Sequence, residues 1–233
     1  MTTLLIATRN AHKVGEIAAI LGDGVQCRPL LKEFPAAPVP VEDAGTFAGN
    51  ALKKAESLAG WLRARPAVLP EPAFVLADDS GLEVDALDGA PGIHSARFAA
   101  LEASKDGNCP DADNNAKLLR LLADVPLAKR TARFRCVLAL VEVNRAVPGL
   151  TPQVFEGACE GWIDFAPRGS GGFGYDPLFI PTGHTQSFAE LGERVKNGLS
   201  HRARALAKLR AWLGDHDARQ FPPPSSAEGR GLG

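Results

Sequence analysis

The segment from Phe74 to Ala77 is entirely apolar and runs directly into two adjacent aspartates, Asp78 and Asp79. An apolar run of this length is typical of a strand that is buried on both faces. Burying an unpaired carboxylate costs on the order of several kcal/mol, so this region needs a compensating cation. A structural alternative is that one aspartate caps the turn after the strand while the other pairs with a lysine. That alternative explains one carboxylate more readily than two.

Short apolar segments alternate with segments of helical spacing, which is typical of an α/β fold. Strands are predicted over Thr3–Ala7, Val25–Leu30, Ala73–Ala77, Leu82–Leu87, Ala132–Glu142 and Val154–Phe165. The last two are expected to form an antiparallel hairpin with its turn at Pro148 and Gly149. Helices are predicted over Val14–Leu21, Thr46–Leu62, Asp113–Leu122 and Ser200–Leu213.

This pattern predicts a long mixed β-sheet flanked by helices, with two lobes around a central cleft. Residues 1–213 are expected to form a single α/β domain. Gly214 is expected to end the last helix. Residues 214–233 are rich in proline, glycine and serine, which predicts a disordered C-terminal tail.

The formal net charge of -1 argues against the global positive field that attracts nucleic acid or an acidic membrane. Any phosphate must therefore be bound by a local site. The four cysteines lie far apart and form no CxxC pair, so neither a disulfide scaffold nor a zinc site is expected. The N-terminal apolar run is too short for a signal peptide, and no segment has the length of a membrane span. We therefore expect a cytoplasmic protein.

The polar loop TRNAHK, Thr8 to Lys13, lies between a predicted strand and the start of a helix. Backbone N–H groups and the positive end of a helix dipole suit phosphate at such a place. The plainer interpretation is that Asn10 or Thr8 caps the helix while the basic residues face solvent. On this loop alone the plainer interpretation is favoured.

Three other segments carry polar or aromatic groups suited to a nucleotide. Asp78 and Asp79 are oxygen ligands of the kind that Mg²⁺ prefers, and the segment VEDAG adds Glu42 and Asp43. The loop GSGGFGYDPLF, residues 169–179, surrounds two aromatic residues with glycines that allow close approach of a ligand, although a glycine-rich turn with two core aromatic residues explains it equally well. In the segment KNGLSHRARAL, Ser200 caps a helix whose first turn is basic, which points to an anionic or polar ligand there.

Five motifs in this order resemble those of the inosine triphosphate pyrophosphatase family: TRNAHK, TFAGNALKKA, ADDSGLEVDAL, GGFGYDPLF and KNGLSHRARA. The resemblance spans Leu4 to about Leu213, and the bacterial XTP/dITP diphosphatases look most similar. It implies Mg²⁺-dependent hydrolysis of non-canonical purine nucleoside triphosphates (ITP, dITP and XTP) to the monophosphate and pyrophosphate, which cleanses the nucleotide pool. It also implies the two-lobed fold of that family and a homodimer.

The resemblance implies roles for individual residues. Asp79 matches the family's proton acceptor and magnesium ligand, Asp43 falls where a metal-binding glutamate is common, and Asp78 is a third candidate ligand. The implied substrate-binding residues are Thr8, Arg9, Asn10, Ala11, His12, Lys13, Ser80, Phe173, Gly174, Tyr175, Asp176, Lys196, His201 and Arg202. Among them, Arg9, Lys13 and Lys196 are candidates to stabilise the pyrophosphate leaving group.

Three positions depart from the family pattern. Asp43 is shorter than the usual glutamate, Gly49 stands where relatives commonly have glutamate, and His94 stands where tyrosine is frequent. Asp43 and Gly49 fall at or near the positions implied for the metal site, so this protein is expected to differ from its relatives in its affinity for Mg²⁺.

Two alternatives to this activity stay open at the level of the sequence. One is a nucleotide-binding sensor that retains the pocket without turnover. The other is a pyrophosphatase of other modified nucleotides, such as modified pyrimidine triphosphates. Purine selection is expected from hydrogen bonds to the 6-oxo group, because a donor built for it would stay unpaired against the 6-amino group of adenine.

Overall fold

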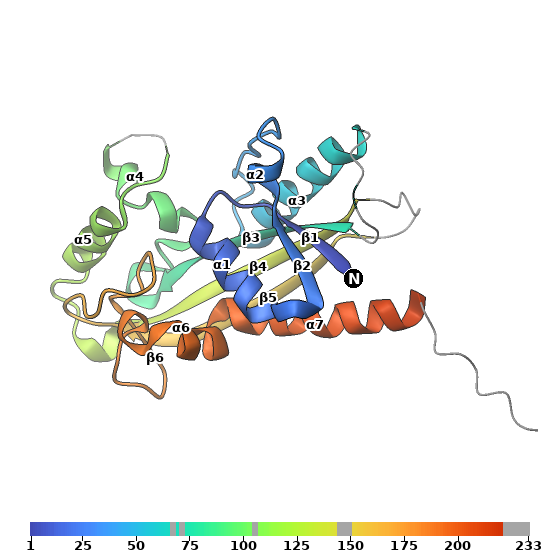
Figure 1. Cartoon of the computed structure of the whole chain (residues 1–233). Coiled ribbons are helices and arrows are strands. Elements are labelled where there is room, and N and C mark those ends of the chain that lie inside the picture. The colour runs from blue at the N-terminus through green and yellow to red at the C-terminus, as the bar shows by residue number, and fades with distance from the viewer. Residues whose placement is uncertain (66–68, 70–72, 104–106, 144–150, 221–233) are drawn as a thin grey trace, which may run out of the picture.

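The computed structural model of the protein describes residues 1–65, 69, 73–103, 107–143 and 151–220. These residues form a six-stranded β-sheet flanked by helices (Figure 1), which confirms the predicted α/β class. In spatial order the strands are β2 (Val25–Pro29), β1 (Thr2–Ile6), β3 (Ala73–Val84), β4 (Thr131–Glu142), β5 (Gln153–Ile163) and β6 (Phe179–Pro181).

The described helices are α1 (Ala11–Leu21), α2 (Leu30–Glu33), α3 (Phe47–Arg63), α4 (Ala100–Ala103), α5 (Asp111–Leu121), α6 (Phe188–Leu199) and α7 (His201–Gln220). A short 3-10 helix, Gly92–Arg97, follows β3. Within the described ranges no helix combines the length and the apolar character needed to cross a membrane.

The sheet is mixed, as predicted. Strand β1 pairs in parallel with β2 and β3, whereas β3, β4, β5 and β6 pair in antiparallel succession. The predicted hairpin is therefore confirmed as β4 and β5. Its predicted turn at Pro148 and Gly149 lies outside the described residues.

Strand β3 differs from the prediction of two separate strands. It runs without a break from Ala73 to Val84, so Asp78 and Asp79 lie in its middle and not beyond its end. The reason is that β4 supplies a partner along the whole length, from Phe74 opposite Glu142 to Val84 opposite Ala132. Strand β1, in contrast, reaches only to Leu76 on the other edge of β3.

Side chains alternate between the two faces of the sheet, as the two-residue period of a strand requires. Even-numbered side chains of β1 and β3 pack with α1 and α7 in a cluster that includes Leu4, Ile6, Phe74, Leu76, Leu206 and Leu209. Odd-numbered side chains pack with α3 in a cluster that includes Leu5, Val75, Ala77, Ala51, Ala55 and Leu58. Because both faces are covered here, the strands are apolar runs.

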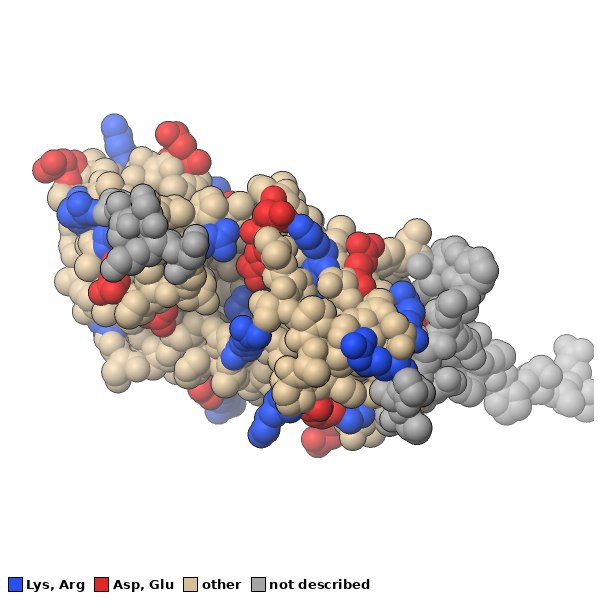
Figure 2. Space-filling view, turned by 90° about the horizontal axis from the view of Figure 1, so that it is seen from above, with Lys and Arg blue, Asp and Glu red and all other residues tan. Residues whose placement is uncertain are grey.

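The distal halves of β3, β4 and β5 extend beyond β1 and build a second lobe. Its core is a third cluster that includes Leu82, Val84, Leu118, Phe134, Phe179 and Phe188. Seen from above, the surface is hollowed between two bulges, with lysine and arginine side chains at the edges of the hollow (Figure 2). The predicted two lobes around a cleft are thus present, and the long strands join them.

Local capping signals set several helix ends. Asn10 caps α1 and Thr46 caps α3, whose start was predicted at Gly45 or Thr46. Helix α5 begins earlier than predicted, at Asp111 after Pro110, because proline readily precedes the first helical turn. Helix α6 was not predicted, since Gly192 in a left-handed conformation (φ 76°) divides it into two short helical pieces.

The prediction that Gly214 ends the last helix was wrong. Helix α7 continues to Gln220, because residues around Gly214 pack on the sheet. The Trp212 ring lies 6.0 Å from that of Phe74, and the His216 ring lies 5.9 Å from it. Such packing outweighs the helix propensity cost of one glycine, about 1 kcal/mol. Disorder of the tail stays a prediction only for residues 221–233, which lie outside the described ranges.

Candidate active site

The site begins where β1 ends and β3 continues. The last link between the two strands is the Ala7 N–H, which donates to the carbonyl of Leu76 (2.8 Å). From there the chain turns into the loop Thr8–Asn10 and then into α1. The edge of β3 at Asp78–Ser80 therefore faces the cleft, with the N-terminus of α1 beside it. This position corresponds to the carboxyl end of a parallel strand, where ligands of α/β sheets gather.

The loop before α1 is held by its own side chains. The Asn10 Oδ1 atom accepts hydrogen bonds from the backbone N–H of His12 (2.9 Å) and of Lys13 (3.3 Å). The Thr8 hydroxyl accepts from the Asn10 N–H (3.1 Å). The capping interpretation of Asn10 is therefore confirmed, and it presents the first turn of α1 toward the cleft. Arg9 is exposed and lines a separate depression beside β2.

Asp78 lies at the centre of a buried ion cluster on the α1 and α7 face of the sheet. Its Oδ1 accepts from Lys13 Nζ (2.5 Å) and the Ser80 hydroxyl (2.8 Å). Its Oδ2 accepts from Arg202 Nε (2.9 Å) and the Cys136 thiol (3.3 Å). Burial alone raises the pKa of this carboxyl, but the Arg202 and Lys13 charges hold the pKa well below its usual range. Asp78 is ionised and clamped.

The surroundings of Asp78 leave it unsuited to bind a metal, although it was one of the predicted candidates. A carboxylate has about four lone-pair positions. All four are occupied by the donors above, and the side chain is 0% exposed. Asp78 instead joins α1, β3 and α7 to one another.

Asp79 points to the opposite face of the sheet, toward α3. Its Oδ2 accepts from Asn50 Nδ2 (3.2 Å) and its Oδ1 from Lys54 Nζ (3.1 Å). Each oxygen thus keeps lone-pair capacity for a further partner. Burial raises the pKa of Asp79, and the nearby Lys54 ammonium only partly opposes this. A carboxylate of raised pKa at the edge of a cleft is a candidate general base.

The Lys54 ammonium links Asp79 to a second carboxylate, that of Glu42. The Lys54 ammonium donates to Asp79, to Glu42 Oε1 (3.3 Å) and to the backbone carbonyl of Asp78 (2.8 Å). Burial lowers the pKa of Lys54, but the surrounding carboxylates outweigh burial and raise it.

Asp43, the predicted metal-site residue of this segment, faces away. It is exposed and pairs with Lys53, whose hydrogen bond lowers the pKa of Asp43. Of the two acidic residues in this segment, Glu42 contacts Lys54 beside Asp79, whereas Asp43 lies in solvent. Close packing explains why glycine occupies position 49, because a Cβ atom there would lie 2.7 Å from the Cβ of Ala44.

The other end of the cleft is formed by the loop Phe173–Asp176. The buried Asp176 carboxylate accepts from the Phe173 N–H (2.9 Å) and from Lys196 Nζ (2.6 Å). Gly172 is required before this loop, because its φ is +73° and a Cβ would meet Asp176 Oδ2 at 2.1 Å. Burial raises the pKa of Asp176, against the lowering effect of Lys196.

Lys196 and Arg202 share one further carboxylate, that of Glu16 in α1. Lys196 Nζ donates to Glu16 Oε1 (2.7 Å), and Arg202 Nη1 donates to Glu16 Oε2. An unbroken chain of ion pairs therefore runs from Lys13 through Asp78, Arg202, Glu16 and Lys196 to Asp176. Glu16 was not predicted as a site residue, because it lies on a helix face with no local signal of function.

His201 is buried beside this chain. Its ring stacks on Phe134 with a centroid distance of 4.8 Å and an interplanar angle of 12°. Burial, and then the positive charges of Arg202 and Lys196, place the pKa of His201 well below its usual range. The imidazole is therefore neutral at pH 7, and its buried Nδ1 has no hydrogen-bond partner within the described part of the chain.

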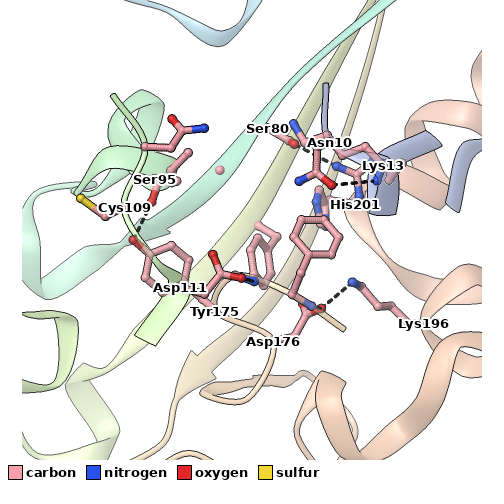
Figure 3. A pocket seen from close by; sticks show the side chains of 17 residues that line it. Asn10, Lys13, Ser80, Ser95, Cys109, Asp111, Tyr175, Asp176, Lys196 and His201 are labelled. Atoms are coloured by element: carbon pink, nitrogen blue, oxygen red, sulfur yellow. Dashed lines mark hydrogen bonds and ion pairs between the residues drawn. The ribbon is translucent and has the colours of Figure 1, made fainter. Parts of the chain in front are cut away.

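The pocket extends from α1 to the 3-10 helix Gly92–Arg97. Figure 3 shows Asn10, Lys13, Ser80 and His201 near one another, with the Asp176–Lys196 pair close by and Tyr175 and Ser95 at the opposite end. The buried Tyr175 hydroxyl donates to the Ser95 carbonyl (2.9 Å), so this hydroxyl braces the loop. The Asp111 carboxylate braces it too, by accepting from the Gly174 N–H (2.6 Å). Neither Ser95 nor Asp111 was predicted.

The described residues contain no group of three metal-binding side chains of the histidine, cysteine, aspartate or glutamate type. The donor set at Lys54 nevertheless suits Mg²⁺, which takes one or two carboxylates and completes its shell with water and substrate phosphates. Asp79 and Glu42 are hard oxygen donors that already converge on one cation, the Lys54 ammonium. They therefore fit a magnesium ion.

The family match, the curated relatives and the solved structures all point to the same protein family. Residues 4–212 match the Ham1 family. A dITP/XTP pyrophosphatase of Geobacillus kaustophilus is 50% identical over 210 residues, which cover 90% of this chain and 93% of that protein. One of Geobacter sulfurreducens is 49% identical over 215 residues, covering 92% and 98%. The structure of a HAM1 protein from Coxiella burnetii superposes with a TM-score of 0.74 at 36% identity, covering 92% of this chain and 100% of that one.

Proposed function

The chain belongs to the Ham1 family, and we propose that it hydrolyses dITP, ITP and XTP to the nucleoside monophosphate and pyrophosphate. The observation that carries this proposal is the chain of ion pairs from Lys13 to Asp176. It ties a helix N-terminus suited to phosphate to a glycine-rich aromatic loop suited to a nucleobase. The names of the curated relatives support the choice of substrates.

The phosphates belong at the first turn of α1. Backbone N–H groups and the helix dipole favour an anion there, and Lys13 adds a positive charge. The pocket and Ser80 lie on one face of β3 and Asp79 lies on the other, so a bound triphosphate must cross the open edge of that strand. This path brings a phosphate near Asp79 at the point where β1 no longer covers β3.

A magnesium ion is proposed at Asp79 and Glu42, the two carboxylates that share Lys54. When bound, it neutralises the charge of phosphate oxygens and of the leaving pyrophosphate. Asn50 and Lys54 orient the Asp79 carboxylate by donating to its two oxygens. Asp43 and Asp78 are not part of this proposed set, for the reasons of geometry given above.

Asp79 is the proposed proton acceptor for the attacking water. Each of its oxygens keeps lone-pair capacity beyond the bonds from Asn50 and Lys54, and Lys54 Nζ is close enough to stabilise the carboxylate between turnovers. Among the cations of the ion-pair chain, Lys13 is best placed to stabilise the departing pyrophosphate, because it lies in the first turn of α1. Lys196 and Arg9, proposed for this role from the sequence, lie at the base end and outside the pocket, respectively.

The base end suits a 6-oxopurine. Lys196 and Arg202 are obligate donors and Asp176 is an acceptor, so the pocket can donate to a 6-oxo oxygen and accept from the neighbouring ring N–H. Adenine presents a 6-amino donor at the same place, which would face the Lys196 and Arg202 donors without an acceptor between them, and this costs binding energy. The Phe173 ring, on the wall of the pocket, offers a stacking surface.

The remaining expectations concern the whole protein. We expect a homodimer that acts in the cytoplasm and binds neither nucleic acid nor membrane, consistent with the net charge of -1. We also expect residues 1–213 to form one domain. Size-exclusion chromatography with light scattering tests the dimer.

Pyrophosphate release from a panel of triphosphates tests the proposed function. We expect release from dITP, ITP and XTP to exceed release from ATP, GTP, dUTP and methylated pyrimidine triphosphates, and to require added Mg²⁺. Tight binding of dITP without pyrophosphate release would instead identify a sensor. Preferred turnover of a pyrimidine triphosphate would identify a pyrophosphatase of another modified nucleotide.

A further inference from the structure

The Phe173 ring separates two hollows. On one side it lines the active-site pocket together with Ser80 and Arg202. On the other side it lines a second hollow between α1 and α6, together with Gly15 and Gly192. Lys196 also lines both hollows, so the orientation of the Phe173 ring contributes to the wall that a bound base meets.

Hydrogen bonds from the Phe173 N–H to Asp176 and from the Gly174 N–H to Asp111 hold the backbone here, but they do not set the side-chain rotation of Phe173. Gly172 and Gly174 flank it with φ values of +73° and +63°, a region that favours glycine. What holds the ring is contact with side chains. Lys196 Nζ lies 4.7 Å from the ring centroid, and the His12 imidazole stacks on the ring at 5.4 Å with an interplanar angle of 19°.

His12 contacts Phe173 from the second hollow and does not line the active-site pocket. It is the second residue of α1, and its backbone N–H donates to the capping Asn10 side chain (2.9 Å). The position of the imidazole is therefore set by the same helical turn that is suited to bind phosphate. The His12–Phe173 stack is a direct side-chain contact between the phosphate end and the base end of the cleft.

We propose that His12 is a positioning residue that holds Phe173 against the nucleobase and so couples phosphate binding to base binding. The inference rests on the proposed function, because it takes the Phe173 side of the pocket as the base side. The contribution comes from the flat face of the imidazole, and any flat aromatic ring at this position supplies it. A direct contact of His12 with phosphate would instead depend on its hydrogen-bonding nitrogens.

The test compares His12→Ala with His12→Phe, which keeps a flat ring and removes the nitrogens. For dITP, we expect His12→Ala to raise KM by about three- to tenfold, with a smaller change in kcat, the size expected for loss of one aromatic stack. His12→Phe should restore KM. Inhibition by pyrophosphate, which lacks a base, should be equal in all three proteins. Far-UV circular dichroism and thermal unfolding confirm that each variant is folded.

Two results would overturn the inference while the unmodified protein still hydrolyses dITP. One is an unchanged KM in His12→Ala. The other is weaker inhibition by pyrophosphate in both variants without rescue by phenylalanine, which would assign His12 to the phosphates. If the unmodified protein fails to hydrolyse dITP, the proposed function falls and this inference falls with it.

Discussion

Asp78 and Asp79 are neighbours in the chain, but alternation along β3 places them on opposite faces of the sheet in different surroundings. Asp78 meets four donors and is held ionised, with a pKa well below its usual range. Asp79 meets two donors and has a raised pKa. The pair therefore divides into a structural clamp, Asp78, and the proposed proton acceptor, Asp79. The same division separates Glu42, which shares Lys54 with Asp79, from the exposed Asp43.

Substitutions in the segment Glu42–Asp43 test the proposed metal set. We expect Glu42→Gln to raise the Mg²⁺ concentration needed for half-maximal activity by about tenfold or more, because one of two carboxylate ligands is lost. Asp43→Asn is the matched control, since Asp43 pairs only with exposed Lys53 among the contacts described. Titration of pyrophosphate release with Mg²⁺ measures both. An equal effect of the two substitutions would contradict the assignment.

At the scale of elements, α3 carries the groups that orient Asp79. Asn50 also accepts from the Ala44 N–H (2.9 Å), which fixes the preceding loop and with it Glu42. Gly49 sits beside this contact, where a Cβ would lie 2.7 Å from the Cβ of Ala44. The glycine therefore allows the loop to pack against α3 at a cost in helix propensity.

Two glycine substitutions in α3 separate the helix-propensity cost of a glycine from its role in packing against the preceding loop. Gly60→Ala, at an exposed position with open space for a Cβ, should stabilise the protein by about 0.5–1 kcal/mol. Gly49→Ala should destabilise it by about 1–3 kcal/mol, because Ala44 and its loop must shift. Urea unfolding gives both values. Equal stabilisation by the two changes would show that the loop adapts freely.

Features governed by local chemistry could be predicted from the sequence, and features governed by distant contacts could not. Asn10 and Ser200 are recognisable as caps because their partners lie within three residues. Glu16 is not recognisable, because its partner Lys196 is 180 residues away. Likewise β3 was predicted as two strands, since only the pairing with β4 keeps Asp78 and Asp79 inside a continuous strand. Which carboxylate faces which partner depends on the fold and could not be predicted from the motifs.

At the scale of the molecule, the cleft joins two lobes across the open edge of β3. Asp78 binds Lys13 from α1 and Arg202 from α7, so one buried carboxylate links three elements. Since its pKa is lower in the folded state, it contributes stability above the pKa of the unfolded chain, and this contribution is lost as the pH falls through the folded pKa.

Neutralising Asp78 tests this role. We expect Asp78→Asn to lower the free energy of unfolding at pH 7 by about 3–5 kcal/mol, because buried Arg202 loses one of its two carboxylate partners and half-buried Lys13 loses the carboxylate it contacts. Glu156→Gln breaks a half-exposed pair with Arg135 and should cost about 0.5 kcal/mol or less. The difference between Asp78→Asn and the unmodified protein should shrink in acid. A difference that grows as the pH falls would contradict the ionised clamp.

In the proposed mechanism, Asp79 activates water at a nucleotide site that the rest of the cleft assembles. The direct measurement is dITP binding and pyrophosphate release by Asp79→Asn beside the unmodified protein. We predict a folded variant that still binds dITP, with kcat lower by at least about 10²–10⁴-fold. Pyrophosphate release at the unmodified rate by this variant would show that Asp79 is not the proton acceptor.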